Sequence, residues 1–148
     1  MTKKQAPART RGPREVGFSM RIPSRAQFGK RARDEVVSFA LANRIAHAEL
    51  DEFTFAVGEA LANAIEHSGT GDVIEVHCRI ESDKIVATIT DSGCGFNPQT
   101  GRPFPEVLSE RGRGLPIMER CTDIFAVRSA PGKGTAVVLG RYLQRKNS

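Results

Sequence analysis

The chain of 148 residues is long enough for one domain with a single substantial core, and its hydrophobic (39%) and charged (26%) fractions are ordinary for a soluble globular protein. Its net charge of +5 reflects residues 1–14, which are rich in Lys and Arg and contain no acid, so the basic balance does not mark the domain as a nucleic-acid binder. The three cysteines lack C-x-x-C spacing, and no apolar run reaches membrane-spanning length. These features argue against a disulfide framework, a zinc site and membrane contact, and predict a cytoplasmic protein.

The chain begins with a basic arm and continues into one domain. Residues 1–14 have no apolar periodicity, so we expect them to be disordered. The domain is expected over residues 15–143, with a short tail at 144–148. Apolar residues alternate over 16–22, which predicts a half-buried strand that ends at Pro23.

A first helix is predicted after this strand. Ser24 and Gln27, three residues apart, form the signature of a capping box at its N-terminus, and the helix is expected to reach about Arg44. Apolar residues at three- and four-residue steps predict one buried face. That face consists of Phe28, Ala32, Val36, Phe39 and Ala40.

A second helix is predicted to begin near Leu50 to Glu52 and to end at Ser68 and Gly69. Its apolar residues recur at helical spacing, and Gly69 suits the left-handed cap position. The apolar face is Phe53, Val57, Leu61, Ala64 and Ile65.

The polar side of this second helix is the most informative pattern in the chain. Glu59, Asn63 and Glu66 recur three or four residues apart, so their side chains share one stripe. Exposed helix faces also often carry Glu and Asn, so this helix alone supports a ligand site and a solvated face equally. The small residues expected to leave room for a ligand are Ala60, Ala62 and Ala64.

The rest of the chain alternates between strands and one more helix. A hairpin with a polar turn is followed by an irregular segment of the kind that forms functional lids, a short helix and a second hairpin. This order predicts an α+β fold, a two-layer sandwich with helices on one face of a mixed, mostly antiparallel sheet. The predicted ranges are 73–80, 85–90, 124–130 and 135–142 for strands, 97–113 for the lid and 115–121 for the helix.

Glycine-rich segments flank the predicted lid. Asp91 ends a strand and is followed by Ser-Gly-Cys-Gly, where glycines let the backbone approach a ligand and the carboxylate can accept a hydrogen bond from an amine such as that of adenine. Residues 111–114, Arg-Gly-Arg-Gly, precede a helix whose N-terminal N–H groups favour phosphate. Residues 132–135, Gly-Lys-Gly-Thr, are favoured as a hairpin turn. No Walker A or G-x-G-x-x-G motif is present, and each segment alone is weak.

Taken in order, these segments resemble the nucleotide-binding boxes of the GHKL ATPases, which share the Bergerat fold. Glu59–His67 (E-A-L-A-N-A-I-E-H) resembles the N box, and Asp91–Phe96 (D-S-G-C-G-F), Gly112–Leu115 (G-R-G-L) and Gly132–Thr135 (G-K-G-T) resemble the three glycine boxes. The resemblance covers roughly residues 16–142. On the E-A-x-x-N-A-x-x-H pattern and the short length, the chain is most similar to the anti-sigma-factor serine/threonine kinases of bacterial sporulation and stress control.

The resemblance implies a role for each matching residue. Asn63 would coordinate the Mg²⁺ that bridges the ATP phosphates, and Glu59 would be the base that orients or deprotonates the acceptor hydroxyl. Asp91 would accept a hydrogen bond from the adenine amine, with Gly93 and Gly95 beside the base. The other implied nucleotide contacts are Arg111, Gly112, Arg113, Gly114, Leu115 and Thr135. His67 is expected at a capping or packing position, and His47 and His77 at the surface.

The implied function is that of an ATP-dependent protein serine/threonine kinase. It would phosphorylate an anti-anti-sigma protein of the STAS type and sequester a sigma factor, as a homodimer. The alternative is a nucleotide-gated regulatory binding protein without phosphoryl transfer. Glu59 and Asn63 together favour the kinase, because a switch needs the metal ligand more than the base. A sensor histidine kinase is less favoured, because no helical pair precedes the domain, and direct nucleic-acid binding is not expected.

Overall fold

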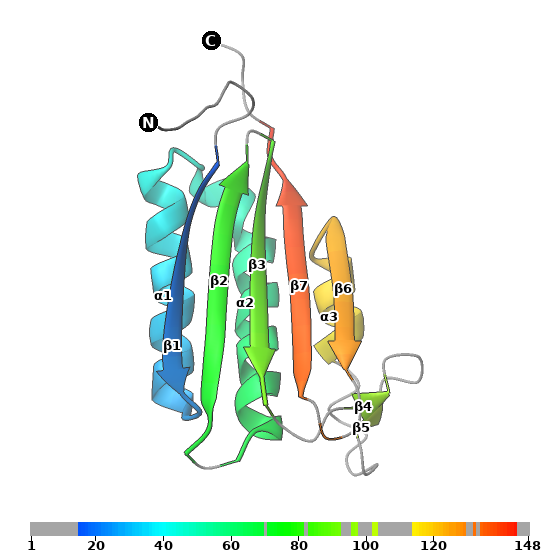
Figure 1. The fold of residues 1–148 in the computed structure, drawn as a ribbon. Helices are drawn as coiled ribbons and strands as arrows, with labels where there is room; N and C mark the ends of the chain where they lie inside the picture. Colours follow the sequence, from blue (N-terminus) through cyan, green and yellow to red (C-terminus); the bar gives the residue numbers. More distant parts are fainter. Residues whose placement is uncertain are drawn as a thin grey trace, which may run out of the picture.

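A five-stranded sheet with helices on one of its faces forms the framework of the chain (Figure 1). The computed structural model describes residues 15–69, 71–81, 83–92, 96–97, 102–103, 114–129, 132 and 134–144. The predicted N-terminal arm, almost all of the C-terminal tail and most of the predicted lid lie outside these residues.

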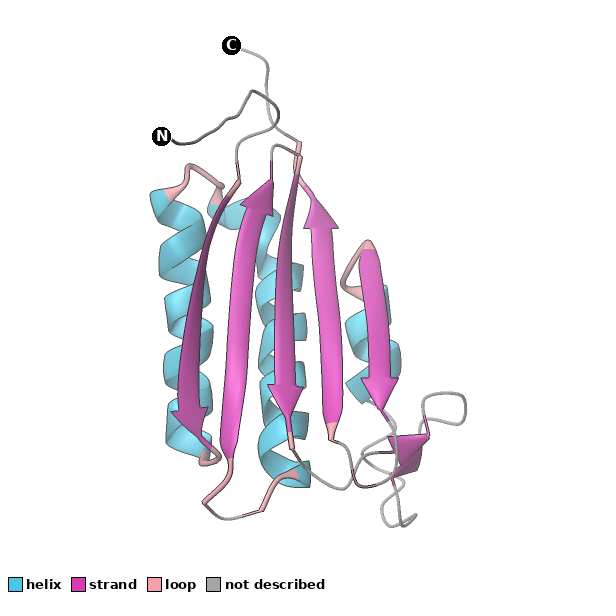
Figure 2. Cartoon of the chain, in the orientation of Figure 1, coloured by secondary structure: helices cyan, strands magenta, loops and turns pink. Residues whose placement is uncertain are grey.

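The strand order of the sheet is β1-β2-β3-β7-β6, and every pairing between these strands is antiparallel. The secondary structure (Figure 2) shows helices layered behind this sheet, so the predicted α+β sandwich is confirmed. Hairpins join β2 to β3 and β6 to β7, which accounts for much of the antiparallel pairing. The strands are β1 (Val16–Pro23), β2 (Val73–Glu81), β3 (Lys84–Asp91), β6 (Ile124–Ser129) and β7 (Thr135–Tyr142).

Buried and exposed residues alternate along the strands, and the buried ones lie on the face that the helices cover. In β2 every second residue is buried, while the residues between them are exposed or half-buried. Because successive side chains of a strand point to opposite faces, the buried set faces the helix layer. This set consists of Ile74, Val76, Cys78 and Ile80, and the central strand β3 adds Ile85, Ala87 and Ile89.

Helix α1 (Ala26–Ala42) has the predicted buried face but not the predicted cap. Its N-cap residue is Arg25, and no side chain caps it. The strand continues through Pro23 and the helix starts late, so the capping-box prediction is wrong. The hydroxyl of Ser24 instead donates to the carbonyl of Ile65 at 3.3 Å, which links the start of α1 to the second helix.

Helix α2 (His47–His67) begins earlier than predicted and packs between α1 and α3 behind the sheet (Figure 1). Its side chains Phe53, Val57 and Leu61 are fully buried. The predicted left-handed cap at Gly69 is wrong, because the chain leaves the helix through Ser68 in an extended conformation. The positive φ, 90°, falls on Gly71, where the chain turns into β2.

The segment between the two hairpins is described in part. Two short strands, β4 (Phe96–Asn97) and β5 (Arg102–Pro103), pair with each other, so the start of the predicted irregular lid contains paired backbone. Helix α3 (Gly114–Arg120) then leads into β6, with Pro116 in its first turn as predicted. Among the helices described, none combines the length and apolar character needed to cross a membrane.

Candidate functional site

Several elements end or begin at the same end of the sheet. Strands β3 and β6 run toward this end and β7 starts there, while α2 finishes and α3 begins beside it (Figure 1). The polar residues at these termini therefore come together although they are far apart in the sequence. The site is built from three groups: the flank of α2, the end of β3, and the turn between β6 and β7.

The flank of α2 carries Glu59 and Asn63. The two side chains are half-exposed and lie one helical turn apart, so they follow one another along the same side of the helix. The side of α2 that faces the sheet carries its buried apolar residues, and the side that faces α1 lines a groove. Glu59 and Asn63 are thus left on the flank toward α3.

The alanines of α2 do not have the predicted role of leaving space beside this stripe. Ala60 and Ala64 are 1% and 3% exposed and belong to the core against the sheet. Ala62 is exposed, but it lines the groove on the α1 side. Alternate positions on a helix point about 200° apart, so these alanines could not all share the side of Glu59 and Asn63.

Asp91 and Thr135 are the buried polar residues among those that the structure describes. Asp91 is the last residue of β3 and Thr135 the first of β7, and they pair directly in the antiparallel register. They are 6% and 4% exposed, respectively. Burying a carboxylate and a hydroxyl side by side is costly unless polar partners meet them. This end of the sheet therefore holds a carboxylate and a hydroxyl at fixed neighbouring positions.

The approach of the turn to β3 depends on Gly134. Its φ is 76°, which side chains other than hydrogen rarely allow. A β-carbon at this position would overlap the carbonyl oxygen of Asp91 and lie 2.9 Å from the α-carbon of Ser92. Residue 134 must therefore be glycine for Thr135 to reach its place opposite Asp91.

Ser129 was not recognised in the sequence as part of the site. It is the last residue of β6 and pairs with Thr135, and the oxygens of the two hydroxyls are 2.8 Å apart. Its hydroxyl also donates to the carbonyl of Gly134 at 3.1 Å. The predicted hairpin could have placed Ser129 opposite Thr135, but no sequence motif includes this serine.

His67, the last residue of α2, is half-buried near the end of β3. Burial lowers the pKa of its imidazole below the ordinary value, and the negative charge of Asp91 acts in the opposite direction. Helix α2 and strand β3 finish at the same end of the molecule (Figure 1), which accounts for the influence of the Asp91 carboxylate on this imidazole. His67 is thus a packed histidine, as predicted, and His47 and His77 are exposed, as predicted.

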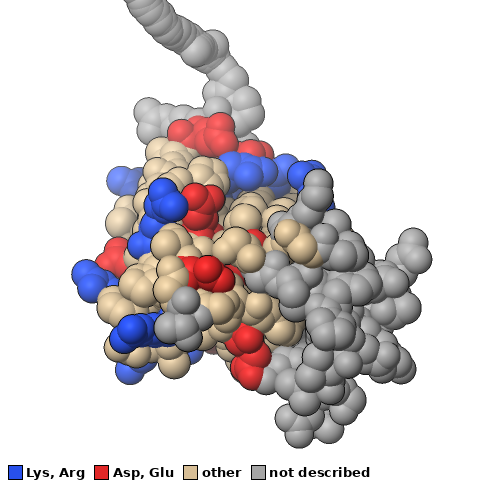
Figure 3. Space-filling model, turned by 60° about the horizontal axis from the view of Figure 1, so that its bottom comes forward, with Lys and Arg blue, Asp and Glu red and all other residues tan. Residues whose placement is uncertain are grey.

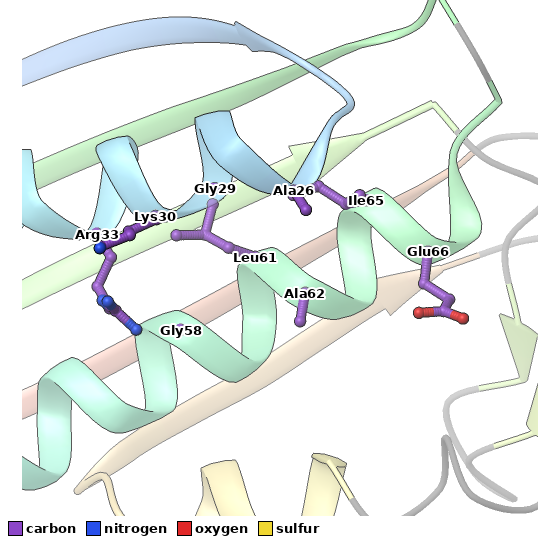
Figure 4. Close-up of a pocket in the computed structure, with 9 residues that line it drawn as sticks. All are labelled: Ala26, Gly29, Lys30, Arg33, Gly58, Leu61, Ala62, Ile65 and Glu66. Carbon is purple, nitrogen blue, oxygen red and sulfur yellow. The ribbon is translucent and has the colours of Figure 1, made fainter.

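A groove of about 300 Å³ lies on the other side of α2, toward α1 (Figure 4). Leu61 and Ile65 contribute its apolar lining from α2, and Lys30 and Arg33 contribute cations from α1. Gly58 leaves space for Arg33, whose δ-carbon would lie 3.4 Å from a β-carbon at that position. Neither Glu59 nor Asn63 lines this groove, so it is separate from the flank that carries them.

The charged side chains at this end of the sheet affect which ligand can bind there. In the space-filling view that brings this end forward (Figure 3), acidic side chains reach the middle of the described surface. No three His, Cys, Asp or Glu side chains of the described part gather into a metal-binding group. Lys and Arg side chains lie on the same described surface, interspersed with the acidic ones.

Several predicted site residues fall outside the described part. They are Gly93, Gly95, Arg111, Gly112 and Arg113. For Gly114 and Leu115 only the backbone is described, and it forms the first turn of α3 as the resemblance implied. The structure thus brings Asp91 and Thr135 together and leaves the phosphate-side predictions for experiment.

Comparison with known proteins identifies the family. Residues 22–141 match the family described as histidine kinase-like ATPase domain. The anti-sigma F factor of Pasteuria penetrans is 35% identical over 106 residues, which cover 65% of this chain and 70% of that protein. The anti-sigma F factor of Caldanaerobacter subterraneus subsp. tengcongensis is 30% identical over 135 residues, which cover 86% of this chain and 94% of that protein. The chain belongs to the histidine kinase-like ATPase domain family of GHKL proteins, in the branch of the anti-sigma-factor kinases.

Solved structures show the same fold. The RsbU and RsbW domains of a Mycobacterium tuberculosis protein match with a TM-score of 0.66 and 15% identity, over 96% of this chain and 34% of that chain. The chain thus spans about a third of the length of that protein chain. The histidine kinase domain of the Erythrobacter litoralis blue-light activated kinase matches with a TM-score of 0.53 and 18% identity, over 82% of this chain and 62% of that chain. At these identities the likeness concerns the fold alone.

Proposed function

We propose that the chain is an anti-sigma factor with ATP-dependent protein serine/threonine kinase activity. It phosphorylates an anti-anti-sigma protein of the STAS type and sequesters a sigma factor, acting as a cytoplasmic homodimer. The observation that carries the proposal is the buried pair of Asp91 and Thr135 at the end of the sheet where α2, with Glu59 and Asn63 on its flank, also ends. Family membership and the curated relatives named anti-sigma F factor support it.

The base of the nucleotide is proposed to bind at Asp91 and Thr135. A carboxylate accepts hydrogen bonds and donates none, so it selects an amine over a carbonyl. The low exposure of both side chains strengthens this selection, because a buried polar atom left without a partner is costly. Gly134 supports the same assignment, since it lets the strand start close to Asp91.

The phosphates are proposed to lie along the α2 flank toward α3. Mg²⁺ prefers oxygen ligands and takes few of them from protein, relying on phosphates and water for the rest. The carboxamide oxygen of Asn63, half-exposed on this flank, fits such an ion. Such an ion would supply neutralisation of the phosphate charge. Arg111, Arg113 and the backbone of residues 112–115 are proposed as the further phosphate contacts.

Glu59 is proposed to act on the acceptor. It lies one turn before Asn63 on the same flank and is half-exposed, so a serine or threonine hydroxyl of a partner protein can reach it. Its carboxylate would orient that hydroxyl and accept its proton as the bond to the γ-phosphorus forms and the bond from that phosphorus to the bridging oxygen of ADP breaks. Phosphoryl transfer mainly requires positioning and charge neutralisation, which matches a site with one base and one metal ligand.

A transfer assay separates this function from a nucleotide-gated switch. The purified protein is incubated with Mg²⁺ and γ-labelled ATP and with STAS-type proteins of the source organism, while binding of ATP is measured by calorimetry. We expect Glu59→Gln to bind ATP as the wild type does and to transfer phosphate about 10²- to 10⁴-fold more slowly. Asn63→Ala should lose the Mg²⁺-dependent part of the affinity.

The control is Glu35→Gln, which removes an exposed carboxylate from α1 and should change neither readout. Wild-type protein that binds ATP but labels no STAS protein would establish the nucleotide-gated switch instead. Equal transfer by the wild type and Glu59→Gln would remove Glu59 from the role of base. Absence of ATP binding by the wild type would overturn the proposal as a whole.

A further inference from the structure

Three polar side chains form a row across the end of the sheet. Register places Asp91 of β3 opposite Thr135 of β7, and Thr135 opposite Ser129 of β6. Directly opposed residues in antiparallel strands project to the same face, so all three project from the helix-covered face. Asp91 and Thr135 are buried and Ser129 is half-buried. Ser129 is thus the outer member of a row whose other two members belong to the proposed base-binding site.

The hydroxyl of Ser129 has one proton, and its geometry indicates where that proton goes. The oxygen lies 3.1 Å from the carbonyl oxygen of Gly134, which can only accept. It also lies 2.8 Å from the hydroxyl oxygen of Thr135, where either group could donate. With the serine proton directed to Gly134, the 2.8 Å contact is a hydrogen bond only when Thr135 donates its proton to Ser129. The Thr135 oxygen then has only lone pairs to offer to a ligand.

We propose that Ser129 is a positioning residue that makes Thr135 a hydrogen-bond acceptor and thereby sharpens the preference for a base carrying an exocyclic amine. This proposal rests on the proposed nucleotide site. Asp91 and Thr135 then present acceptors side by side, which suits the amine of adenine. The keto oxygen of guanine, itself an acceptor, would meet lone pairs on both. Without Ser129, the Thr135 hydroxyl can rotate and donate to a keto oxygen, so the discrimination weakens.

The test compares the affinities of ATP and GTP, measured by calorimetry in the presence of Mg²⁺. For the wild type we expect ATP to bind more tightly than GTP. Ser129→Ala should reduce the ratio of the two affinities about 10-fold, the size expected for one misdirected buried hydrogen bond. Ser129→Thr keeps a hydroxyl and should restore the ratio. Ser19→Ala, an exposed serine on β1, is the matched control.

A double-mutant cycle isolates the effect on Thr135. In a Thr135→Ala background, Ser129→Ala should cause no further change in the ratio, because the hydroxyl that Ser129 orients is absent. Thermal unfolding of each variant reports folding separately. If Ser129→Ala does not fold, Ser129→Cys, a poor donor of similar size, replaces it with the same expected result.

The outcomes distinguish this inference from the function on which it rests. A wild type that binds neither nucleotide contradicts the proposed function. A wild type that prefers ATP, with the same preference in Ser129→Ala or Ser129→Cys, retains the proposed function and overturns the role of Ser129. An equal loss of preference in Ser129→Thr also overturns it, because a hydroxyl is still present. An effect of Ser129→Ala that persists undiminished without Thr135 overturns it as well.

Discussion

Asp91 and Thr135 face each other across β3 and β7, and neither side chain is more than 6% exposed. Their positions at the end of one strand and the start of the next mean that the sheet itself sets the spacing of a carboxylate and a hydroxyl. A polar pair held in this way has little freedom to adapt. We therefore expect ligand affinity to respond sharply to small changes there.

Asp91→Asn tests the carboxylate directly. The amide keeps one acceptor but can turn its two donors toward the amine of the base, which would leave the buried site mismatched. We expect a loss of about 1–3 kcal/mol of ATP binding free energy, or roughly 10- to 100-fold in Kd, measured by calorimetry. Asp83→Asn, in the exposed β2–β3 turn, should bind as the wild type does. Equal affinities for Asp91→Asn and the wild type would contradict the assignment.

Gly134→Ala tests the close approach of the turn to β3. The added β-carbon would overlap the Asp91 carbonyl oxygen at a positive φ, so we expect destabilisation of several kcal/mol, on the order of 3, in chemical unfolding. Gly132→Ala is the matched control, since φ is 74° there but nothing lies within 4 Å of the new carbon. It should cost only the conformational strain, about 1 kcal/mol. Similar losses for both variants would show that the contact with Asp91 is not decisive.

His67 predicts a pH dependence of stability. Because burial lowers its pKa below the ordinary value near 6.5, the unfolded chain binds more protons than the folded chain between the lowered pKa and about 6.5. The contribution of neutral His67 is fully present above this window and is lost as the pH falls through it. In urea unfolding at pH 7.5 and pH 5, His67→Gln should lose less unfolding free energy on acidification than the wild type does. His77→Gln, a change at an exposed histidine, should lose as much as the wild type. An identical pH dependence for His67→Gln would contradict this account.

Gly58→Ala is expected to increase the free energy of unfolding. Gly58 lies in the middle of α2, where glycine is less favourable than alanine by about 0.5–1 kcal/mol. The new β-carbon would make ordinary contact with the Arg33 side chain at 3.4 Å, so no clash offsets this gain. We expect unfolding free energy to rise by about that amount in urea titrations. Gly29→Ala offers a contrast, because its β-carbon would lie 2.7 Å from the δ-carbon of Ile65, which must shift.

The site residues that could be predicted are those marked by a local sequence pattern, such as helical spacing or the end of an apolar strand. Glu59 and Asn63 were found because helical spacing places residues four apart on one side, and Asp91 because it ends an apolar strand before glycines. The roles assigned to Glu59, Asn63 and the phosphate-side residues stay predictions. The prediction that the alanines of α2 leave room for a ligand was wrong. Side chains two positions apart on a helix point in nearly opposite directions, and packing against the sheet places Ala60 and Ala64 in the core.

By itself, the sequence determined the order and type of α1, α2, α3 and the strands of the main sheet, since the periodicity of apolar residues is a local property of each segment. The short strands β4 and β5 were not predicted. Only the tertiary structure decided which polar side chains became hydrogen-bond partners. Ser24 resembled a helix cap but binds the carbonyl of Ile65, and Ser129 belonged to no motif but pairs with Thr135. The physical reason is that a hydroxyl takes whichever partner the packing of sheet and helices brings within reach, and strand register sets that choice.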